Sequence, residues 1–161
     1  MIFMMKDWIF SGDDWTCGVR VAGVLVRNGK ILLQRERDGN EYALPGGHIH
    51  IGERLEEGLI REWQEEMGTE IKCQRMLWTE ECFWEWKGKK NHSLSFYYRI
   101  ETEKPDDLPD DGLTHCHKDN SRIVLEWVEL DALNDIVVYP EFLKEAIFRL
   151  DEPMRHFVTR T

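Results

Sequence analysis

Residues 44–69 read Leu-Pro-Gly-Gly-His-Ile-His-Ile-Gly-Glu-Arg-Leu-Glu-Glu-Gly-Leu-Ile-Arg-Glu-Trp-Gln-Glu-Glu-Met-Gly-Thr, a glycine-rich loop that runs into an acidic helix. Residues three or four apart on a helix share a face, whereas residues two apart do not. The large apolar side chains of this helix recur every four residues, at Leu55, Leu59, Trp63 and Met67. This spacing predicts an apolar face that packs on a core.

The carboxylates of the same helix crowd a second arc. A turn of about 100° per residue places Glu66 about 40° to one side of Glu62 and Glu65 about 60° to the other. Like charges at these spacings cost a few tenths of a kcal/mol per pair, and the helix has no lysine. Arg61, four residues after Glu57 and four before Glu65, is predicted to brace both. The remaining charge predicts a divalent ion held by oxygen, Mg²⁺ or Mn²⁺, with a merely solvated acidic face as the alternative.

Three glycines suggest close approaches around this helix. Gly46 and Gly47 allow a sharp turn that exposes backbone amides and carbonyls next to the helix start, where they can meet a metal or phosphate oxygens. Gly58 lies one turn before Glu62 on the same arc, although glycine costs about 1 kcal/mol inside a helix relative to alanine. We therefore expect another group to come close to the helix there.

The spacing of these residues resembles the Nudix box of the Nudix hydrolases. The fixed positions are Gly47, then Glu53 after five residues, then Arg61-Glu62 after seven, and finally Glu65-Glu66 and Gly68. Only Thr69 departs, because an aliphatic residue is usual at that place. The resemblance implies that the metal ligands are the Gly47 carbonyl, Glu62, Glu65 and Glu66, and that the catalytic residues are Arg61, Glu62 and Glu65.

The resemblance also implies roles around the box. Arg61 would orient the carboxylates, and Glu53 would fix the loop to the helix. Arg35 stands where a basic residue of the family often touches substrate phosphate, and a solvated strand-end arginine is the alternative. The general base stays open at this point, with Glu101, Glu103 and the aspartate-rich residues 103–121 as candidates by position.

The remaining chain predicts strands, one long loop and a closing helix. Residues 17–26 are rich in β-branched side chains, and Asn28-Gly29 is a hairpin signal. The other expected elements are strands at 30–35, 92–100 and 123–130, a long strand or strand pair at 70–86, a loop at 103–121 and a helix at 142–150 that follows Pro140. This order predicts an α/β protein, and the resemblance implies a Nudix-type α/β/α sandwich around a mixed β-sheet.

Composition predicts one domain over residues 1–161. The chain has 42% hydrophobic residues and a net charge of −10, which argue against disorder and against bulk binding of DNA or anionic lipid. The four cysteines form no C-x-x-C pair, and the apolar N-terminal run is interrupted by Lys6 and Asp7. We therefore expect a cytoplasmic location with no membrane span, and a homodimer stays open.

The resemblance implies hydrolysis of a diphosphate linkage with Mg²⁺ or Mn²⁺ as cofactor. The short chain favours a nucleoside triphosphate or other small nucleotide as substrate. The alternatives are an ADP-ribose or nucleotide-sugar pyrophosphatase, a non-catalytic nucleotide-binding regulator, and an isomerase of the isopentenyl diphosphate type. The intact set of box carboxylates favours an enzyme over a regulator, and no motif locates the cysteine and acid that the isomerase would need.

Other polar and aromatic groups have two interpretations each. His115-Cys116-His117 contains zinc-binding residue types, but neighbouring loop residues point in different directions, so a zinc site is disfavoured. His48 and His50 either tune the box loop or lie exposed. The aromatic set Trp78, Phe83, Trp84 and Trp86 could stack a nucleobase, but packing in a core or interface is the favoured role.

Overall fold

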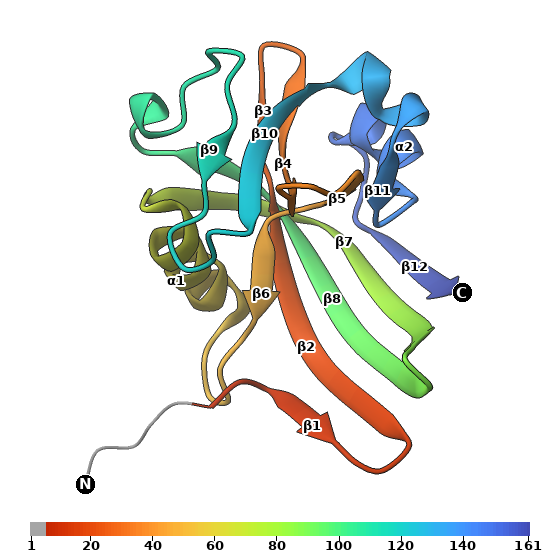
Figure 1. Ribbon diagram of the computed structural model, residues 1–161. Coiled ribbons are helices and arrows are strands. Elements are labelled where there is room, and N and C mark those ends of the chain that lie inside the picture. The colour runs from red at the N-terminus through yellow and green to blue at the C-terminus, as the bar shows by residue number, and fades with distance from the viewer. Residues whose placement is uncertain (1–5) are drawn as a thin grey trace, which may run out of the picture.

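The protein folds into two β-sheets with a helix against one of them, as seen in a computed structural model that describes residues 6–161. The first sheet contains β1 (Ile9–Ser11), β2 (Trp15–Val24), β8 (Lys89–Thr102), β7 (Ile71–Trp86) and β12 (Arg155–Arg160) in that order, with β6 (Gly46–His48) paired to β2. The second contains β11 (Val137–Tyr139), β5 (Glu41–Ala43), β4 (Lys30–Glu36), β10 (Ile123–Glu129) and β9 (His115–Cys116), with β3 (Val26–Arg27) paired to β4. Figure 1 shows the long strands of the first sheet crossing beneath the second.

Helices cover the sheets unevenly. The long helix α1 (Leu55–Met67) lies beside β6 and β2, while α2 (Leu143–Ala146) lies near β11 on the other side of the molecule (Figure 1). Residues 6–161 also form three short 3₁₀ helices: η1 (Pro105–Asp107), η2 (Leu130–Asp135) and η3 (Ile147–Arg149). Both sheets mix parallel and antiparallel pairs, because β2 runs parallel to β8 and β5 runs parallel to β11. The expected α/β class with mixed sheet pairing is confirmed, with the strands divided between two sheets.

Local signals account for the hairpins. Asn28 and Gly29 have φ values of 51° and 75°, and they connect β3 to β4 as predicted. Lys87 and Gly88, with φ values of 50° and 75°, form the matching turn of the long β7–β8 hairpin. Two successive residues with positive φ are typical of tight hairpin turns that match the twist of the strands.

Two apolar clusters hold the layers together. One lies under α1, where Leu59, Trp63 and Met67 pack with Val21 of β2 and Ile100 of β8. Leu59 and Trp63 are fully buried, so the predicted apolar face of the helix is confirmed. Burial of each such side chain contributes about 1.5–3 kcal/mol. The second cluster lies around β4, β7 and α2 and contains Ile31, Leu33, Trp78, Val138 and Leu143.

Several predicted bounds are wrong. The strand expected at 17–26 is split at Leu25, since β2 stays in the first sheet and β3 enters the second. The helix expected at 142–150 is only α2 followed by η3. β12 was not anticipated because it pairs with a strand more than 70 residues away in sequence, Arg155 lying opposite Trp78. The apolar N-terminal residues 1–5 lie outside the described part of the chain.

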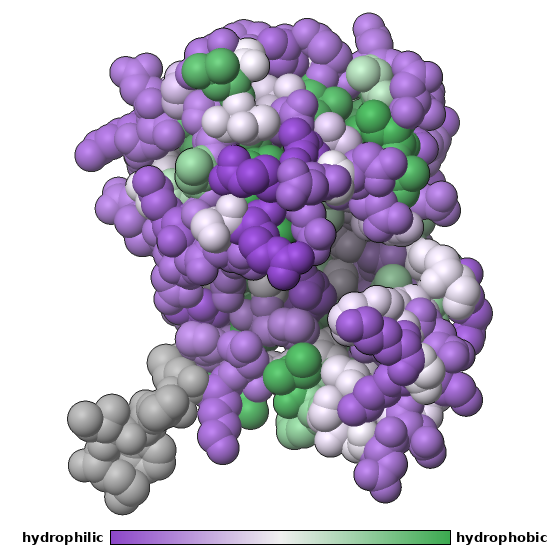
Figure 2. Space-filling view, viewed as in Figure 1, coloured by the Kyte–Doolittle hydropathy of each residue, from purple (hydrophilic) through white to green (hydrophobic). Residues whose placement is uncertain are grey.

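The surface in this view is mostly hydrophilic, with small hydrophobic patches between the charged side chains (Figure 2). A hollow opens between the upper part of the molecule and the ends of β7 and β8 at the lower right (Figures 1 and 2). No helix among residues 6–161 has the length and apolar character needed to cross a membrane. All four cysteines are free thiols.

Candidate active site

Two glycines bring the loop against β2 and α1. β6 pairs with β2 so that Gly46 lies opposite Ala22 and Gly47 opposite Val21. A Cβ atom on Gly46 would lie 2.1 Å from the Val21 carbonyl oxygen, and one on Gly47 would lie 2.6 Å from the Glu62 carboxylate. Because real Cβ atoms do not approach backbone so closely, only glycine fits at position 46. The absent side chain at Gly47 leaves room for the Glu62 carboxylate beside the loop backbone.

The helix that carries the carboxylates has defined ends. Its Glu57 side chain accepts the Arg54 backbone N–H at 3.0 Å, which satisfies one amide at the helix start. Gly68 ends the helix in the left-handed conformation with φ 67°, and its N–H donates to the Gln64 carbonyl. Gly58 meets the expected close neighbours, because a Cβ there would lie 2.9 Å from both Glu53 Oε2 and Ile49 Cγ2. The loop therefore packs directly on the first turns of α1.

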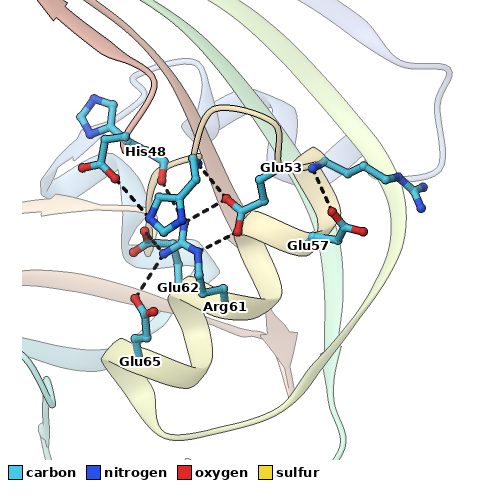
Figure 3. A network of polar contacts seen from close by, with 9 residues as sticks. His48, Glu53, Glu57, Arg61, Glu62 and Glu65 are labelled. Atoms are coloured by element: carbon cyan, nitrogen blue, oxygen red, sulfur yellow. Dashed lines mark hydrogen bonds and ion pairs between the residues drawn. The ribbon is translucent and has the colours of Figure 1, made fainter. Parts of the chain in front are cut away.

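Arg61 is the centre of a polar network between the loop and the helix (Figure 3). Its Nε and Nη2 donate to the two carboxylate oxygens of Glu53 at 2.7 and 3.1 Å, and Nη2 also donates to the His48 carbonyl at 3.2 Å. Nη1 donates to Glu62 at 2.9 Å and to Glu65 at 3.2 Å. The hydrogen bonds, led by those to Glu53, raise the pKa of Arg61 further above its usual range. One guanidinium thus orients three carboxylates.

The predicted pairing of Arg61 with Glu57 is wrong, because the Glu57 carboxylate caps the helix start instead. Glu53 takes that place in the network. Its side chain is only 7% exposed, and Oε2 also accepts the His50 N–H at 2.8 Å. Burial alone would raise the pKa of Glu53, but the hydrogen bonds from Arg61 and His50 outweigh it and lower the pKa. Glu53 therefore stays ionised and ties the loop to the helix, as the resemblance implies.

Glu66 lies outside the reach of Arg61 and has a different environment. Burial, followed by the charge of Glu62 and a hydrogen bond with its carboxyl group, raises the pKa of Glu66 to about 8. The Glu66 Oε2 atom is buried without a hydrogen-bond partner among the described residues. A neighbouring like charge favours the protonated form of a carboxyl group, and a bound cation can take the place of the proton.

The chemistry of this carboxylate pair fits a hard divalent cation. Glu62 lies against the loop backbone at Gly47, and its charge acts on the buried carboxyl group of Glu66, so oxygen donors from loop and helix lie together. Glu65 differs, since it is half exposed and directed at Arg61. Within residues 6–161 no group of three acidic, histidine or cysteine side chains already converges in a metal-binding arrangement. Arg61 occupies part of the carboxylate arc that a metal would otherwise neutralise.

The sequence model of the NUDIX domain matches residues 18–150, which includes the loop and α1. The chain belongs to the Nudix hydrolase family. It is 37% identical over 62 residues to the ADP-ribose pyrophosphatase of Methanocaldococcus jannaschii, a match that covers 37% of each chain. It is 39% identical over 59 residues to a MutT-like protein of Streptomyces ambofaciens, covering 36% of this chain and 38% of the relative.

Little more than a third of each of these curated relatives is matched. The likeness to solved structures extends over more of the chain. The NMR structure of the E. coli ORF135 protein superposes with a TM-score of 0.55 at 22% identity, covering 85% of this chain and 94% of that one. At this identity the likeness establishes the Nudix fold alone.

A second arginine next to the Nudix box was not anticipated from the sequence. Arg20 lies on β2 directly opposite His48 of β6, and strand alternation places it on the sheet face that carries Ala22 and Val24. Its charge opposes the rise in the pKa of Glu66 and, after burial, contributes to the lowered pKa of His48. No hydrogen bond or ion pair to its guanidinium occurs among residues 6–161. The position of Arg20 beside the box could be predicted only from the register in which β2 pairs with the box loop.

Arg35, the basic residue selected from the sequence, lies on β4 in the second sheet. Its Nε donates to Glu126 at 2.8 Å, and its Nη1 donates to the carbonyl of Arg37 at 2.8 Å. The Tyr42 ring lies beneath its guanidinium at 5.8 Å, and the Tyr42 hydroxyl donates to the same Glu126 oxygen at 3.2 Å. The charge of Arg35 is therefore already matched, whereas that of Arg20 is not.

The aspartate-rich residues 103–121, here called the acidic loop, fold against the end of the box helix. Thr69 is buried, and its hydroxyl donates to Asp107 at 3.0 Å. This contact gives a physical reason for a polar residue where the family usually has an aliphatic one. The Lys118 N–H donates to the Glu66 carbonyl at 2.7 Å. Glu103, one candidate base, pairs with Lys72 at 3.2 Å.

The remaining histidines and aromatic residues separate into different environments. His48 is half buried over Gly18, and burial together with Arg20 lowers its pKa, while His50 lies 3.4 Å from Asp7. His115 Nε2 donates to the Pro109 carbonyl oxygen at 2.9 Å. Of the aromatic set, Trp78 is buried in the core, Phe83 stacks on His92, and Trp86 is 64% exposed.

Proposed function

We propose that this protein is a divalent-metal-dependent hydrolase that cleaves the diphosphate linkage of a nucleoside diphosphate derivative. The observation that carries the proposal is the Glu62–Glu66 pair beside Gly47, where burial and the charge of Glu62 raise the pKa of Glu66 and the paired carboxyl groups call for a cation. Bound Mg²⁺ or Mn²⁺ would neutralise phosphoryl oxygens and lower the pKa of an attacking water. Glu62, Glu66 and the Gly47 carbonyl would hold such an ion, with Glu65 as a further ligand or base.

The chain's own residues supply orientation and charge. Arg61 fixes Glu62 and Glu65 relative to the loop through Glu53, so the ligands are held before substrate arrives. The charge of Arg20 acts on Glu66, and its guanidinium forms no ion pair within residues 6–161, so we assign it to substrate phosphate. Arg35 stays the second candidate for this contact, and it would have to leave Glu126 to make it.

Two variants separate these arginines. Arg20→Ala should raise KM for the substrate about tenfold or more, as expected for loss of a hydrogen bond to a charged group. The melting temperature should stay close to that of the wild type, because Arg20 forms no ion pair within residues 6–161. Arg35→Ala should lower the melting temperature, because Glu126 loses a partner at 2.8 Å in a half-buried position. If Arg35→Ala alone raises KM and Arg20→Ala leaves it unchanged, the phosphate contact belongs to Arg35.

The substrate proposed first is a nucleoside triphosphate or another small nucleotide. The name of the M. jannaschii relative supports ADP-ribose or a nucleotide sugar as the second candidate. A panel of nucleoside triphosphates, ADP-ribose and nucleotide sugars, incubated with Mg²⁺ and analysed for phosphate, pyrophosphate and nucleoside monophosphate, distinguishes them. Release of pyrophosphate identifies a nucleoside triphosphate as the substrate. Release of a nucleoside monophosphate together with a sugar phosphate identifies ADP-ribose or a nucleotide sugar.

Matched variants test whether the box carries the reaction. Glu62→Gln and Glu66→Gln should each abolish most turnover, because each removes an anionic ligand at nearly constant shape. Glu56→Gln is the control, since Glu56 is exposed and lies about 120° round the helix from Glu62. Nucleotide binding by calorimetry without turnover of any compound would replace the hydrolase by the non-catalytic regulator. Equal activity in all three variants would remove the box from the mechanism.

A further inference from the structure

The acidic loop places a buried histidine beside one of the proposed metal ligands. His117 Nε2 lies 3.5 Å from Glu66 Oε2, and the two side chains are 7% and 17% exposed. The neighbouring Lys118 N–H donates to the Glu66 carbonyl, so the loop backbone is attached to the same turn of α1. The histidine therefore faces Glu66 from a segment that is anchored to the helix.

The hydrogen bonds of His117 determine which ring nitrogen carries the proton. Nδ1 accepts the backbone N–H of Asp119 at 3.2 Å and of Asn120 at 3.0 Å. A nitrogen that accepts hydrogen bonds has no hydrogen of its own, so the ring is neutral and its proton is on Nε2. Two amides of the loop thus direct the only donor of the ring toward Glu66.

Glu66 needs this donor. Its Oε2 is buried and has no hydrogen-bond partner among the described residues, and an unpaired buried carboxylate oxygen is costly. The 3.5 Å separation from Nε2 is longer than an ordinary N–H···O bond of about 2.9 Å. No competing side chain of the described chain donates to this oxygen, since the hydrogen bonds of Arg61 go to Glu53, Glu62 and Glu65.

We propose that His117 is a positioning residue of the metal site, whose Nε2–H holds Glu66 Oε2 and leaves the other oxygen of Glu66 free for the cation. The inference rests on the proposed function, because it concerns the same carboxylate. A hydrogen-bond donor to a metal-binding side chain fixes the orientation of that side chain. Loss of such a donor typically weakens metal affinity 10–100-fold. His115 has no such role, because its ring contacts the Pro109 carbonyl at 2.9 Å instead.

Two substitutions separate the two ends of the ring. His117→Asn keeps an acceptor near the position of Nδ1 for the loop amides but has no donor that reaches Glu66. His117→Gln extends a donor toward Glu66 but loses the acceptor for Asp119 and Asn120. The readouts are Mn²⁺ affinity without substrate, measured by electron paramagnetic resonance, and the melting temperature in EDTA. His115→Asn is the matched control in the same loop.

We expect His117→Asn to bind Mn²⁺ at least about tenfold more weakly with a melting temperature near that of the wild type. His117→Gln should bind Mn²⁺ nearly as well as the wild type and melt earlier. Wild-type Mn²⁺ affinity in His117→Asn overturns the proposal. A loss of Mn²⁺ affinity in both variants that follows their melting temperatures also overturns it, because His117 would then only stabilise the loop. A wild-type protein that binds no Mn²⁺ overturns the metal-dependent function as well, so the two failures are distinguishable.

The tautomer gives a readout that is independent of metal. In the ¹⁵N-labelled protein in EDTA, ring correlations by NMR should show the His117 proton on Nε2 and a bare Nδ1. A proton on Nδ1, or a doubly protonated ring at neutral pH, overturns the proposal because the donor would then not be set by the loop.

Discussion

Replacement of Glu66 by glutamine should stabilise the metal-free protein, and the increase in the free energy of unfolding should grow as the pH rises. In the folded protein, burial and the neighbouring Glu62 raise the pKa of Glu66 to about 8, from an ordinary value of 4.5. Below pH 4.5 the Glu66 carboxyl group holds its proton in both the folded and the unfolded chain, so the substitution adds little stability. Between the two values the unfolded chain releases the proton that the folded chain keeps, so wild-type stability falls as pH rises, until the folded carboxyl also ionises near pH 8.

The size of the effect follows from the same environment. One pKa unit corresponds to about 1.4 kcal/mol, so a pKa of about 8 sets an upper bound of roughly 5 kcal/mol. Glu66 is 17% exposed and shares the interaction with Glu62, so we take less than half of this bound, about 2 kcal/mol. In a chain of this size that corresponds to a rise in melting temperature of about 4–8 °C.

The assay is thermal unfolding of wild type, Glu66→Gln and the control Glu56→Gln in EDTA at pH 4.0 and pH 8.5. We expect Glu66→Gln to match the wild type at the lower pH and to melt about 4–8 °C higher at the upper pH. Addition of Mg²⁺ at pH 8.5 should then raise the melting temperature of the wild type more than that of the variant, because a ligand stabilises in proportion to its affinity for the native state. Parallel melting of the two proteins at both pH values would refute the reasoning.

Three further predictions test the site and its scaffold. Hydrolysis should vanish in EDTA and return with Mg²⁺ or Mn²⁺, and full activity in chelator would contradict the metal assignment. Arg61→Ala should lose most turnover and about 1–3 kcal/mol of stability, because Glu53 is left buried without the guanidinium that pairs with it. Arg61→Lys should recover stability but not turnover, because lysine lacks the planar guanidinium that orients several carboxylates at once. A fully active lysine variant would argue against orientation by Arg61. Gly46→Ala should lower the melting temperature far more than Gly29→Ala, because the new Cβ at position 46 would lie 2.1 Å from a backbone atom. At Gly29 a Cβ would meet open space, and the substitution would cost only the strain of the positive φ, about 1 kcal/mol. Equal losses would show that the backbone shifts at the β6–β2 contact.

The box helix could be predicted because its signals are local. Leu59, Trp63 and Met67 mark the buried face by spacing alone, and all three are buried as expected. The pairing of Arg61 with Glu57 failed for an equally local reason, since the i,i+4 spacing fits two partners and the helix start also needs the Glu57 carboxylate. Spacing identifies which residues can meet, but competition with the backbone decides which do.

The contributions of Arg20 and His117 could not be predicted because they depend on pairing between distant segments. Arg20 reaches the site only because β2 pairs with the loop in one register, and a shift of one residue would turn it to the other face. His117 reaches Glu66 through a loop whose own sequence has no periodic signal. In the sequence it stood out only as part of a histidine–cysteine–histidine run, which the fold separates.

The charge balance of the box shows where a cation belongs. Arg61 is a single positive group, and its donors are taken by Glu53, Glu62 and Glu65, with Glu53 receiving two of them. Glu66 receives none, and burial together with the charge of Glu62 raises the pKa of its carboxyl group. The uncompensated negative charge therefore lies on the Glu62–Glu66 edge beside Gly47 and not at Glu65. We expect Glu65→Gln to weaken Mn²⁺ binding less than Glu62→Gln or Glu66→Gln, and an equal loss in all three would place the ion nearer to Arg61 than this charge balance allows.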